Sequence, residues 1–155
     1  MSDPTQTTTK LSGRCYCGAL RIQTSAPAQV VAYCHCSDCR RVTGGPVAAF
    51  AAFAPEVINI LPTWPDPVEF TPGVKRWFCQ TCGSAMAAWF DYLPDQMYVP
   101  LGVIDQIDDL APDLHCHANN APDWLHLDDG LPRDNGSGRD YLHAQSAPDT
   151  GPTEQ

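Results

Sequence analysis

Seven of the eight cysteines lie in three short clusters along the chain. These clusters are Cys15-x-Cys17, Cys34-x-Cys36-x2-Cys39 and Cys79-x2-Cys82. Structural zinc is bound by four protein side chains, whereas catalytic zinc is bound by three and keeps one coordination position open. Seven clustered thiols therefore predict two zinc ions, one in a closed set of four cysteines and one in an open set of three.

The closed set is predicted to combine the first and last clusters, Cys15, Cys17, Cys79 and Cys82. The segment Cys79-Gln80-Thr81-Cys82-Gly83 has the form of a zinc knuckle, in which the glycine can adopt a positive φ after a tight turn. Cysteines two apart in a regular strand are too widely spaced to share one small ion, so a bend is expected at Gly18. One ion holding both pairs would tie the start of the domain to its middle and contribute directly to folding.

The open set is predicted to be the middle cluster, Cys34, Cys36 and Cys39, which we interpret as the catalytic residues. A zinc ion bound by three thiolates favours a further soft ligand, above all another thiolate. Zinc also lowers the pKa of a thiol that it binds. The open set therefore predicts chemistry at a sulfur atom or at a carbon attached to sulfur.

Two arginines follow the open set directly in the sequence. A zinc ion with three thiolates is negatively charged, so cations are expected nearby, and Arg40 and Arg41 supply them. Guanidinium groups bind carboxylates well, and both arginines are predicted to bind an anionic ligand. His35, between two ligating cysteines, is expected to point away from the ion and to lie behind the ligands or on the surface.

Short strand-like runs separated by proline and glycine predict a mainly β domain with little helix. The predicted strands cover Ala19–Gln23, Val30–Tyr33, Val47–Phe53, Val57–Leu61, Val68–Phe70, Val74–Phe78, Ala85–Phe90 and Met97–Leu101. One helical turn is predicted at Ser37–Val42, and none is assigned to Val103–Leu110, where acidic residues near the end oppose the helix dipole. A single domain is expected over residues 12–132, between segments 1–11 and 133–155 that are predicted to be disordered.

The chain is acidic, with a formal net charge of -9. Phosphate backbones repel such a chain, so nucleic-acid binding is not expected. No apolar stretch is long enough for a secretory signal or a membrane span, and a cytoplasmic location is expected. Thiols stay reduced in that compartment, which favours metal binding over disulfides.

Three segments resemble the glutathione-dependent formaldehyde-activating enzyme family, which also includes centromere protein V. They are Gly13–Ala19, Cys34–Gly45 and Arg76–Ser84, in the family's order, and His115–Trp124 with Leu131-Pro132 fit its closing segment. The resemblance implies a β-tent fold of small coiled sheets, a structural zinc in the closed set and a catalytic zinc in the open set. It also implies the condensation of formaldehyde with glutathione to S-hydroxymethylglutathione, and the reverse reaction.

Two loops depart from the family's pattern. Phe70–Val74 lacks the serines often found there, and Asp123 separates Pro122 from Trp124, which usually adjoin. The resemblance therefore leaves the thiol and the aldehyde open, because sites rather than folds carry function.

Several other residues are of types that could belong to a site. His115, Cys116 and His117 could form a further ligand cluster, but we interpret them as core or surface groups because the clustered cysteines already fill two sites. On an extended segment, His115 and His117 would share one face, and one histidine could orient a ligand. Lys75 and Arg76 are interpreted as exposed strand residues, and the aspartates from Asp105 to Asp129 as a solvated acidic surface.

These patterns favour a zinc-dependent carbon–sulfur lyase or synthase that acts on the adduct of a glutathione-like thiol and an aldehyde. Two alternatives remain open from the sequence. The first is a non-catalytic scaffold in which both zinc ions are structural. The second is a thiol redox protein that uses Cys36 and Cys39.

Overall fold

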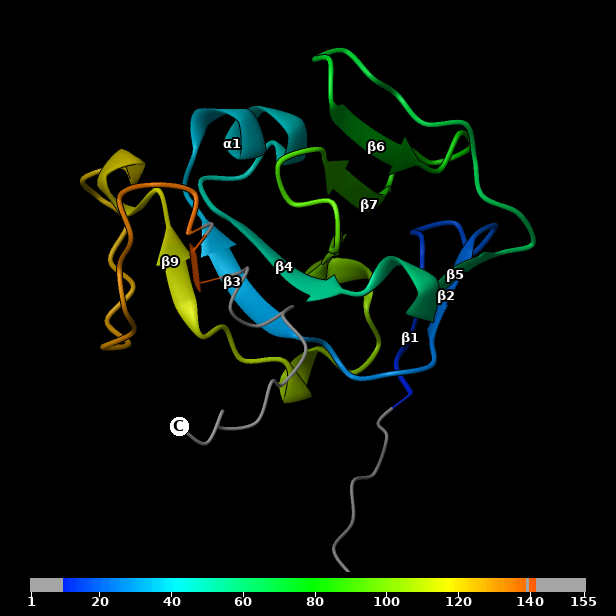
Figure 1. The fold of residues 1–155 in the computed structure, drawn as a ribbon, viewed down its shortest axis with the longest axis horizontal. Helices are drawn as coiled ribbons and strands as arrows, with labels where there is room; N and C mark the ends of the chain where they lie inside the picture. The colour runs from blue at the N-terminus through cyan, green and yellow to red at the C-terminus, as the bar shows by residue number, and fades with distance from the viewer. Residues whose placement is uncertain (1–9, 139, 142–155) are drawn as a thin grey trace, which may run out of the picture.

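Nine short strands form two sheets in a computed structural model that describes residues 10–138, 140 and 141 (Figure 1). The strands are β1 (Ser12–Arg14), β2 (Arg21–Thr24), β3 (Val30–Cys34), β4 (Ala48–Phe53), β5 (Ile58–Leu61), β6 (Val74–Phe78), β7 (Ala85–Phe90), β8 (Met97–Pro100) and β9 (Leu114–Cys116). The smaller sheet has the order β1-β2-β5, and the larger has the order β6-β7-β8-β4-β3-β9. The predicted class, mainly β with small antiparallel sheets, is confirmed, although β9 pairs with β3 in parallel.

The core lies between the sheets and follows the predicted hydrophobic pattern. In β2, Ile22 and Thr24 are buried while the residues that alternate with them are exposed, as a half-buried strand requires. β4 lies between β3 and β8, and its continuous apolar sequence ends in Phe53, which is fully buried. Met86 of β7 is also fully buried and lies in one cluster with Phe53 and with Ile22 of β2, so both sheets contribute large apolar side chains to one core.

One predicted strand does not form, and two short strands were not predicted. At Val68–Phe70, only an isolated bridge between Val68 and Arg76 is present, and Phe70 is 93 % exposed. Prolines before and after this segment lack the N–H group that strand pairing needs. β1 and β9 have three residues each, which is too few to show an alternating pattern.

The predicted helical turn after the second cysteine cluster is confirmed as helix α1 (Ser37–Thr43). Cys36 caps its start, since the Cys36 Sγ accepts a hydrogen bond from the Cys39 N–H at 3.2 Å. Gly44 ends the helix with a left-handed φ of 77°. The remaining helical pieces are the 3-10 turns η1 (Pro55–Val57), η2 (Leu101–Val103), η3 (Ile107–Asp109) and η4 (Ala118–Asn120).

Ordered packing extends slightly beyond the predicted domain limits. Leu11 is 4 % exposed and is hydrogen-bonded to Thr24 in both directions. After Pro132, the chain runs along β9, where the Asp134 N–H donates to the carbonyl of His115. Disorder was predicted for residues 1–11 and 133–155. Of these, residues 1–9, 139 and 142–155 lie outside the described part of the chain, and their disorder stays a prediction. No helix in the described residues has the length and hydropathy needed to cross a membrane.

Candidate metal centres and active site

The four cysteines of the predicted closed set lie together, with their sulfur atoms all within 4.8 Å of one another. The Sγ of Cys17 lies 3.6 Å from that of Cys15 and 3.8 Å from that of Cys79. Four sulfurs arranged tetrahedrally around zinc at about 2.3 Å are separated by about 3.8 Å. The geometry of this set, which we call the quartet, therefore fits a zinc ion.

Two glycine-containing turns bring the quartet together. Gly18 has a φ of 81° and donates its N–H to the carbonyl of Cys15 at 3.1 Å. Gly83 has a φ of 80° and donates in the same way to the carbonyl of Cys79 at 2.8 Å. The expected bend at Gly18 and the expected positive φ at Gly83 are both confirmed, and each turn aims its sulfurs at one point.

Polar groups around the quartet favour negative charge on sulfur. Ser84 accepts a hydrogen bond from the Tyr16 N–H at 2.9 Å, which joins the two turns. The hydroxyl of Ser84 also lies 3.2 Å from the Cys82 Sγ, and this contact lowers the pKa of Cys82 to about 5. Burial raises the pKa of Cys15. The Leu20 N–H, 3.3 Å from the Cys15 Sγ, and the thiols of Cys17 and Cys79 have the opposite effect, and the net result is a lowered pKa.

The three cysteines of the predicted open set also converge, and we call them the triad. Cys34 ends β3, Cys36 caps α1, and Cys39 lies in the first turn of α1. Their sulfur atoms all lie within 4.8 Å of one another. Cys34 is buried, whereas Cys36 and Cys39 are half-buried. The strand end and the helix start thus hold three soft donors around one point, which fits a zinc ion with an open position.

The triad sulfurs compete for protons. Hydrogen bonds from Cys34 and Cys39 lower the pKa of Cys36 to about 2. The same contacts with Cys36 raise the pKa of Cys34 to about 11, and the pKa of Cys39 is raised by both neighbours. One thiolate is therefore accommodated among the three sulfurs, and a cation is needed to stabilise all three as thiolates.

A cavity of about 390 Å³ opens over the triad. Its walls include Asp38, Arg41, Phe70, Arg76, Tyr92, Cys116 and His117. Arg41 thus lines the cavity, and its role in binding a ligand stays a prediction. Arg76 lines the cavity as well, which corrects the interpretation of this side chain as an exposed strand residue. The sequence could not assign Arg76 to this face, because the side of β6 that faces the triad is decided by its pairing with β7.

Arg40, the other arginine predicted to bind ligand, does not line this cavity. Its Nε atom is buried, and no described residue offers that atom a hydrogen-bond partner. Arg40 instead contributes to the lowered pKa of His35. Burial is the main cause of this lowered pKa, and the charges of His115, Arg133 and Arg40 lower it further.

Behind the triad, two histidines and an aspartate form a continuous hydrogen-bonded chain. His35 Nε2 lies 2.8 Å from His115 Nδ1, and His115 Nε2 lies 2.8 Å from Asp129 Oδ2. His35 is 3 % exposed and His115 is 1 % exposed. The ring of Tyr33 stacks on His115 with 4.7 Å between ring centroids. We call His35, His115 and Asp129 the histidine chain; it supports the loop between Cys34 and Cys36 from inside.

The charges in the histidine chain follow from its hydrogen bonds. Burial raises the pKa of Asp129, but the Leu131 N–H, His115 and Arg133 outweigh burial and lower it. An ionised carboxylate only accepts, so His115 donates to Asp129 through Nε2. The Nδ1 of His115 shares a hydrogen bond with His35 Nε2, and the buried Nδ1 of His35 has no partner among the described residues.

The structure corrects two expectations for the closing segment. His117 has a left-handed φ of 51°, which breaks the alternation, so it does not share a face with His115. Instead, Cys116 and His117 line the triad cavity, with Cys116 in register beside Cys34. Asp129 does not belong to a purely solvated acidic surface, because it bonds to His115 and Arg133. In the described residues, His115, Cys116 and His117 do not form a metal-sized cluster.

Two cysteine clusters that could hold metal ions, on a scaffold of small β-sheets, define a β-protein with two candidate metal sites, one of four cysteines and one of three at a cavity. The model of the glutathione-dependent formaldehyde-activating enzyme family matches residues 10–120, and the chain belongs to this family.

The chain is also similar to individual proteins. A protein of Halomonas elongata, provisionally named a glutathione-dependent formaldehyde-activating enzyme, is 28 % identical over 129 residues, which is 76 % of this chain and 81 % of that protein. The crystal structure of a Rhodobacter sphaeroides protein matches with a TM-score of 0.51 and 24 % identity, covering 61 % of this chain and 87 % of that one. At this identity, the second match supports the fold alone.

Proposed function

We propose that this chain is a zinc-dependent carbon–sulfur lyase or synthase that joins a small thiol to an aldehyde and cleaves the adduct. Glutathione and formaldehyde are the substrate pair that membership of the family favours. The observation that carries the proposal is the gathering of three sulfurs, those of Cys34, Cys36 and Cys39, at the wall of a cavity. In this proposal they are the catalytic set, and the quartet has a structural role.

The donor atoms of both sets fit zinc, because all are sulfurs, separated by 3.6 and 3.8 Å where Cys17 meets Cys15 and Cys79 and all within 4.8 Å of one another in the triad. Zinc bound to the triad supplies an open position for a substrate sulfur and lowers the pKa of that thiol. The cavity volume of about 390 Å³ lies in the range of small-molecule sites.

The chain's own side chains bind and orient the two reactants. Arg41 and Arg76 line the cavity and are suited to hold the carboxylates of glutathione. In the synthetic direction, the thiolate sulfur forms a bond to the carbonyl carbon, and the oxygen takes a proton from solvent. Neither partner is oxidised or reduced, and the lyase direction reverses these steps.

The test is the exchange rate between glutathione, formaldehyde and their adduct, followed by NMR against a reaction without enzyme. The wild-type protein should accelerate exchange, and Cys36→Ser should return it to the uncatalysed rate while circular dichroism and the metal content of the quartet are retained. Full activity in Cys36→Ser would contradict the mechanism.

The same experiment separates the alternatives. No excess rate with any thiol would favour a non-catalytic zinc-binding module. A reversible disulfide between Cys36 and Cys39 in a protein that purifies without stoichiometric metal would favour redox chemistry.

A further inference from the structure

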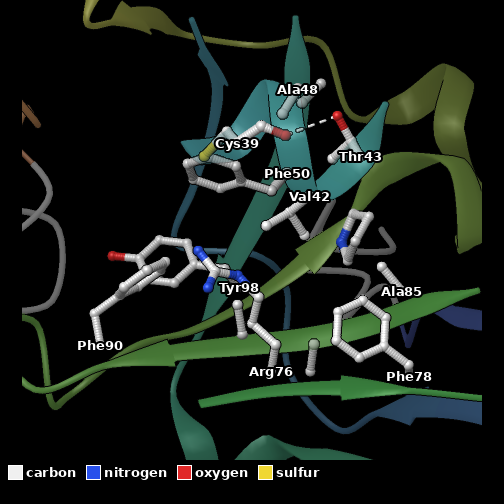
Figure 2. Close-up of a pocket in the computed structure, with 14 residues that line it drawn as sticks. Cys39, Val42, Thr43, Ala48, Phe50, Arg76, Phe78, Ala85, Phe90 and Tyr98 are labelled. Atoms are coloured by element: carbon white, nitrogen blue, oxygen red, sulfur yellow. Dashed lines mark hydrogen bonds between the residues drawn. The ribbon is translucent and has the colours of Figure 1, made fainter. Parts of the chain in front are cut away.

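A smaller apolar recess borders the cavity over the triad, and Figure 2 shows the residues that line this recess. The recess has a volume of about 70 Å³. The two spaces share walls, namely Cys39, Val42, Phe50, Arg76, Phe90 and Tyr98. Figure 2 shows Cys39 and Phe90 on one side of the recess, and Phe78 and Ala85 on the other. A group attached near a sulfur bound at the triad would therefore lie close to the recess.

Short side chains create this recess. Five alanines from β4 and β7 contribute to its lining, Ala48, Ala49, Ala85, Ala87 and Ala88. Each of these side chains ends at Cβ, so the space between the strands and the larger walls of Val42 and Phe78 stays open. Arg76 is the one charged residue in the lining, and its guanidinium lies 5.8 Å from the ring centroid of Phe90.

The entrance to the triad cavity is also apolar. Phe70 is 93 % exposed, while Val42 and Tyr92 are each 39 % exposed, and all three line the cavity. Large apolar side chains gathered at the mouth of a cavity mark a surface that binds apolar groups. Glutathione and formaldehyde do not account for these residues, since glutathione carries two carboxylates and an ammonium group and formaldehyde carries no apolar substituent.

We propose that the recess binds a short alkyl group carried by the sulfur–carbon adduct, so that the enzyme acts on adducts larger than S-hydroxymethylglutathione. An apolar cavity of about 150 Å³ holds benzene. A recess of about half that volume suits a chain of two to four carbons. This inference rests on the proposed function and specifies its substrate class.

The alkyl group can come from either reactant. A longer aldehyde places it on the carbon that bonds to sulfur, and an alkyl thiol places it on the sulfur itself. In both cases the thiol first loses its S–H proton to solvent, the thiolate attacks the carbonyl carbon, the C–S bond forms as the C=O π bond breaks, and the oxygen takes a proton from solvent. The chemistry is therefore the same as with formaldehyde, and the recess changes only which adducts are bound.

Binding can be tested without turnover by calorimetry of the zinc-loaded protein with S-methylglutathione and S-propylglutathione. The propyl compound should bind about tenfold more tightly, because its two additional CH₂ groups are buried. Ala85→Leu fills the side of the recess opposite Cys39 and should remove this preference. Ala111→Leu is the matched control, because Ala111 is exposed and lines neither space. Equal affinity for both compounds in the wild-type protein would overturn the inference.

Turnover then distinguishes the two sources of the alkyl group. One reaction pairs glutathione with butanal, and the other pairs formaldehyde with 1-propanethiol, each compared with glutathione and formaldehyde. At least one alkyl pair should be accelerated, and Ala85→Leu should lower its kcat/KM relative to that for glutathione and formaldehyde by about tenfold. Ala49→Val provides a second filling variant if Ala85→Leu does not fold.

Two different failures remain distinguishable. Acceleration of the reaction of glutathione with formaldehyde alone overturns the recess inference and leaves the proposed function standing, and so does an accelerated alkyl pair whose kcat/KM ratio neither filling variant changes. No acceleration with any pair refutes the proposed function itself.

Discussion

Protons and metal compete for the sulfurs of Cys34, Cys36 and Cys39. The pKa of Cys34 is about 11 and that of Cys39 is also raised, whereas the pKa of Cys36 is about 2. At neutral pH, two of the three sulfurs therefore hold protons that a metal ion must displace. Raising the pH removes these protons and favours the metal, and lowering it has the opposite effect.

We expect the affinity of the triad for zinc to rise by about 100-fold per pH unit between about pH 6 and pH 8, because two protons leave for each ion bound. Competition with a chelator of known, pH-corrected affinity measures this slope. A slope near zero would show that the triad sulfurs are already ionised before the ion binds.

The histidine chain suggests that His115 keeps the triad in place from behind. His115 touches no triad sulfur by hydrogen bond, but it holds His35 between Cys34 and Cys36 and is itself held by Asp129. Groups that orient metal-binding segments typically change metal affinity by about 10- to 100-fold when they are removed.

We therefore predict that His115→Ala weakens metal binding at the triad by about tenfold or more and leaves the quartet occupied. The sulfur-to-cobalt absorption bands of the cobalt-loaded protein should shift, since they report the geometry around the ion. His126→Ala is a matched control at an exposed histidine. An unaltered cobalt spectrum in His115→Ala would refute a positioning role.

These site residues also show how far the sequence could be interpreted. Cysteine clusters can be recognised from their spacing in the sequence, because tight turns bring cysteines that are close in sequence to one point. His35 and His115 are 80 positions apart and meet only because β9 pairs with β3. Arg76 and Phe70 reach the cavity through packing between elements, for which a single sequence carries no signal.

Among the elements, the longer strands were predictable, and the shortest were not. β4 and β7 have six residues each, and their apolar sequences indicated strands, buried on both faces in the case of β4. β1 has three residues and is held by partners far along the chain, including an isolated bridge between Gly13 and Ile104. Such a strand is specified by its contacts rather than by its own sequence.

Gly13 shows how closely β1 approaches the chain after β8. A Cβ added at Gly13 would collide with the carbonyl oxygen of Val103, and the backbone there is fixed by the hydrogen bond from the Asp105 N–H to the Ser12 carbonyl at 2.8 Å. Gly13→Ala should therefore lower the free energy of unfolding by about 1–3 kcal/mol.

Denaturant unfolding measures this change, with Gly102→Ala as the control. A Cβ at Gly102 meets no atom within 4 Å, so Gly102→Ala should be neutral or slightly stabilising. Equal stabilities of the two variants would mean that β1 moves away from Val103 without cost.

Across the whole molecule, the quartet and the triad occupy different structural positions. Cys15 and Cys17 follow β1 of the smaller sheet, whereas Cys79 and Cys82 lie between β6 and β7 of the larger sheet (Figure 1). An ion in the quartet therefore cross-links the two sheets. An ion in the triad joins only the end of β3 to the helix that follows it.

This difference predicts that the two centres affect stability unequally. Cys82→Ser should lower the free energy of unfolding by about 3 kcal/mol or more, because loss of the quartet ion releases the smaller sheet from the larger one. Cys39→Ser makes the same chemical change at the triad and should cost less, because the sheets stay joined. Thermal unfolding of both variants, with zinc content measured on the same samples, tests the ranking. If Cys39→Ser proved the more damaging change in protein that retains a filled quartet, the quartet would not be the structural centre.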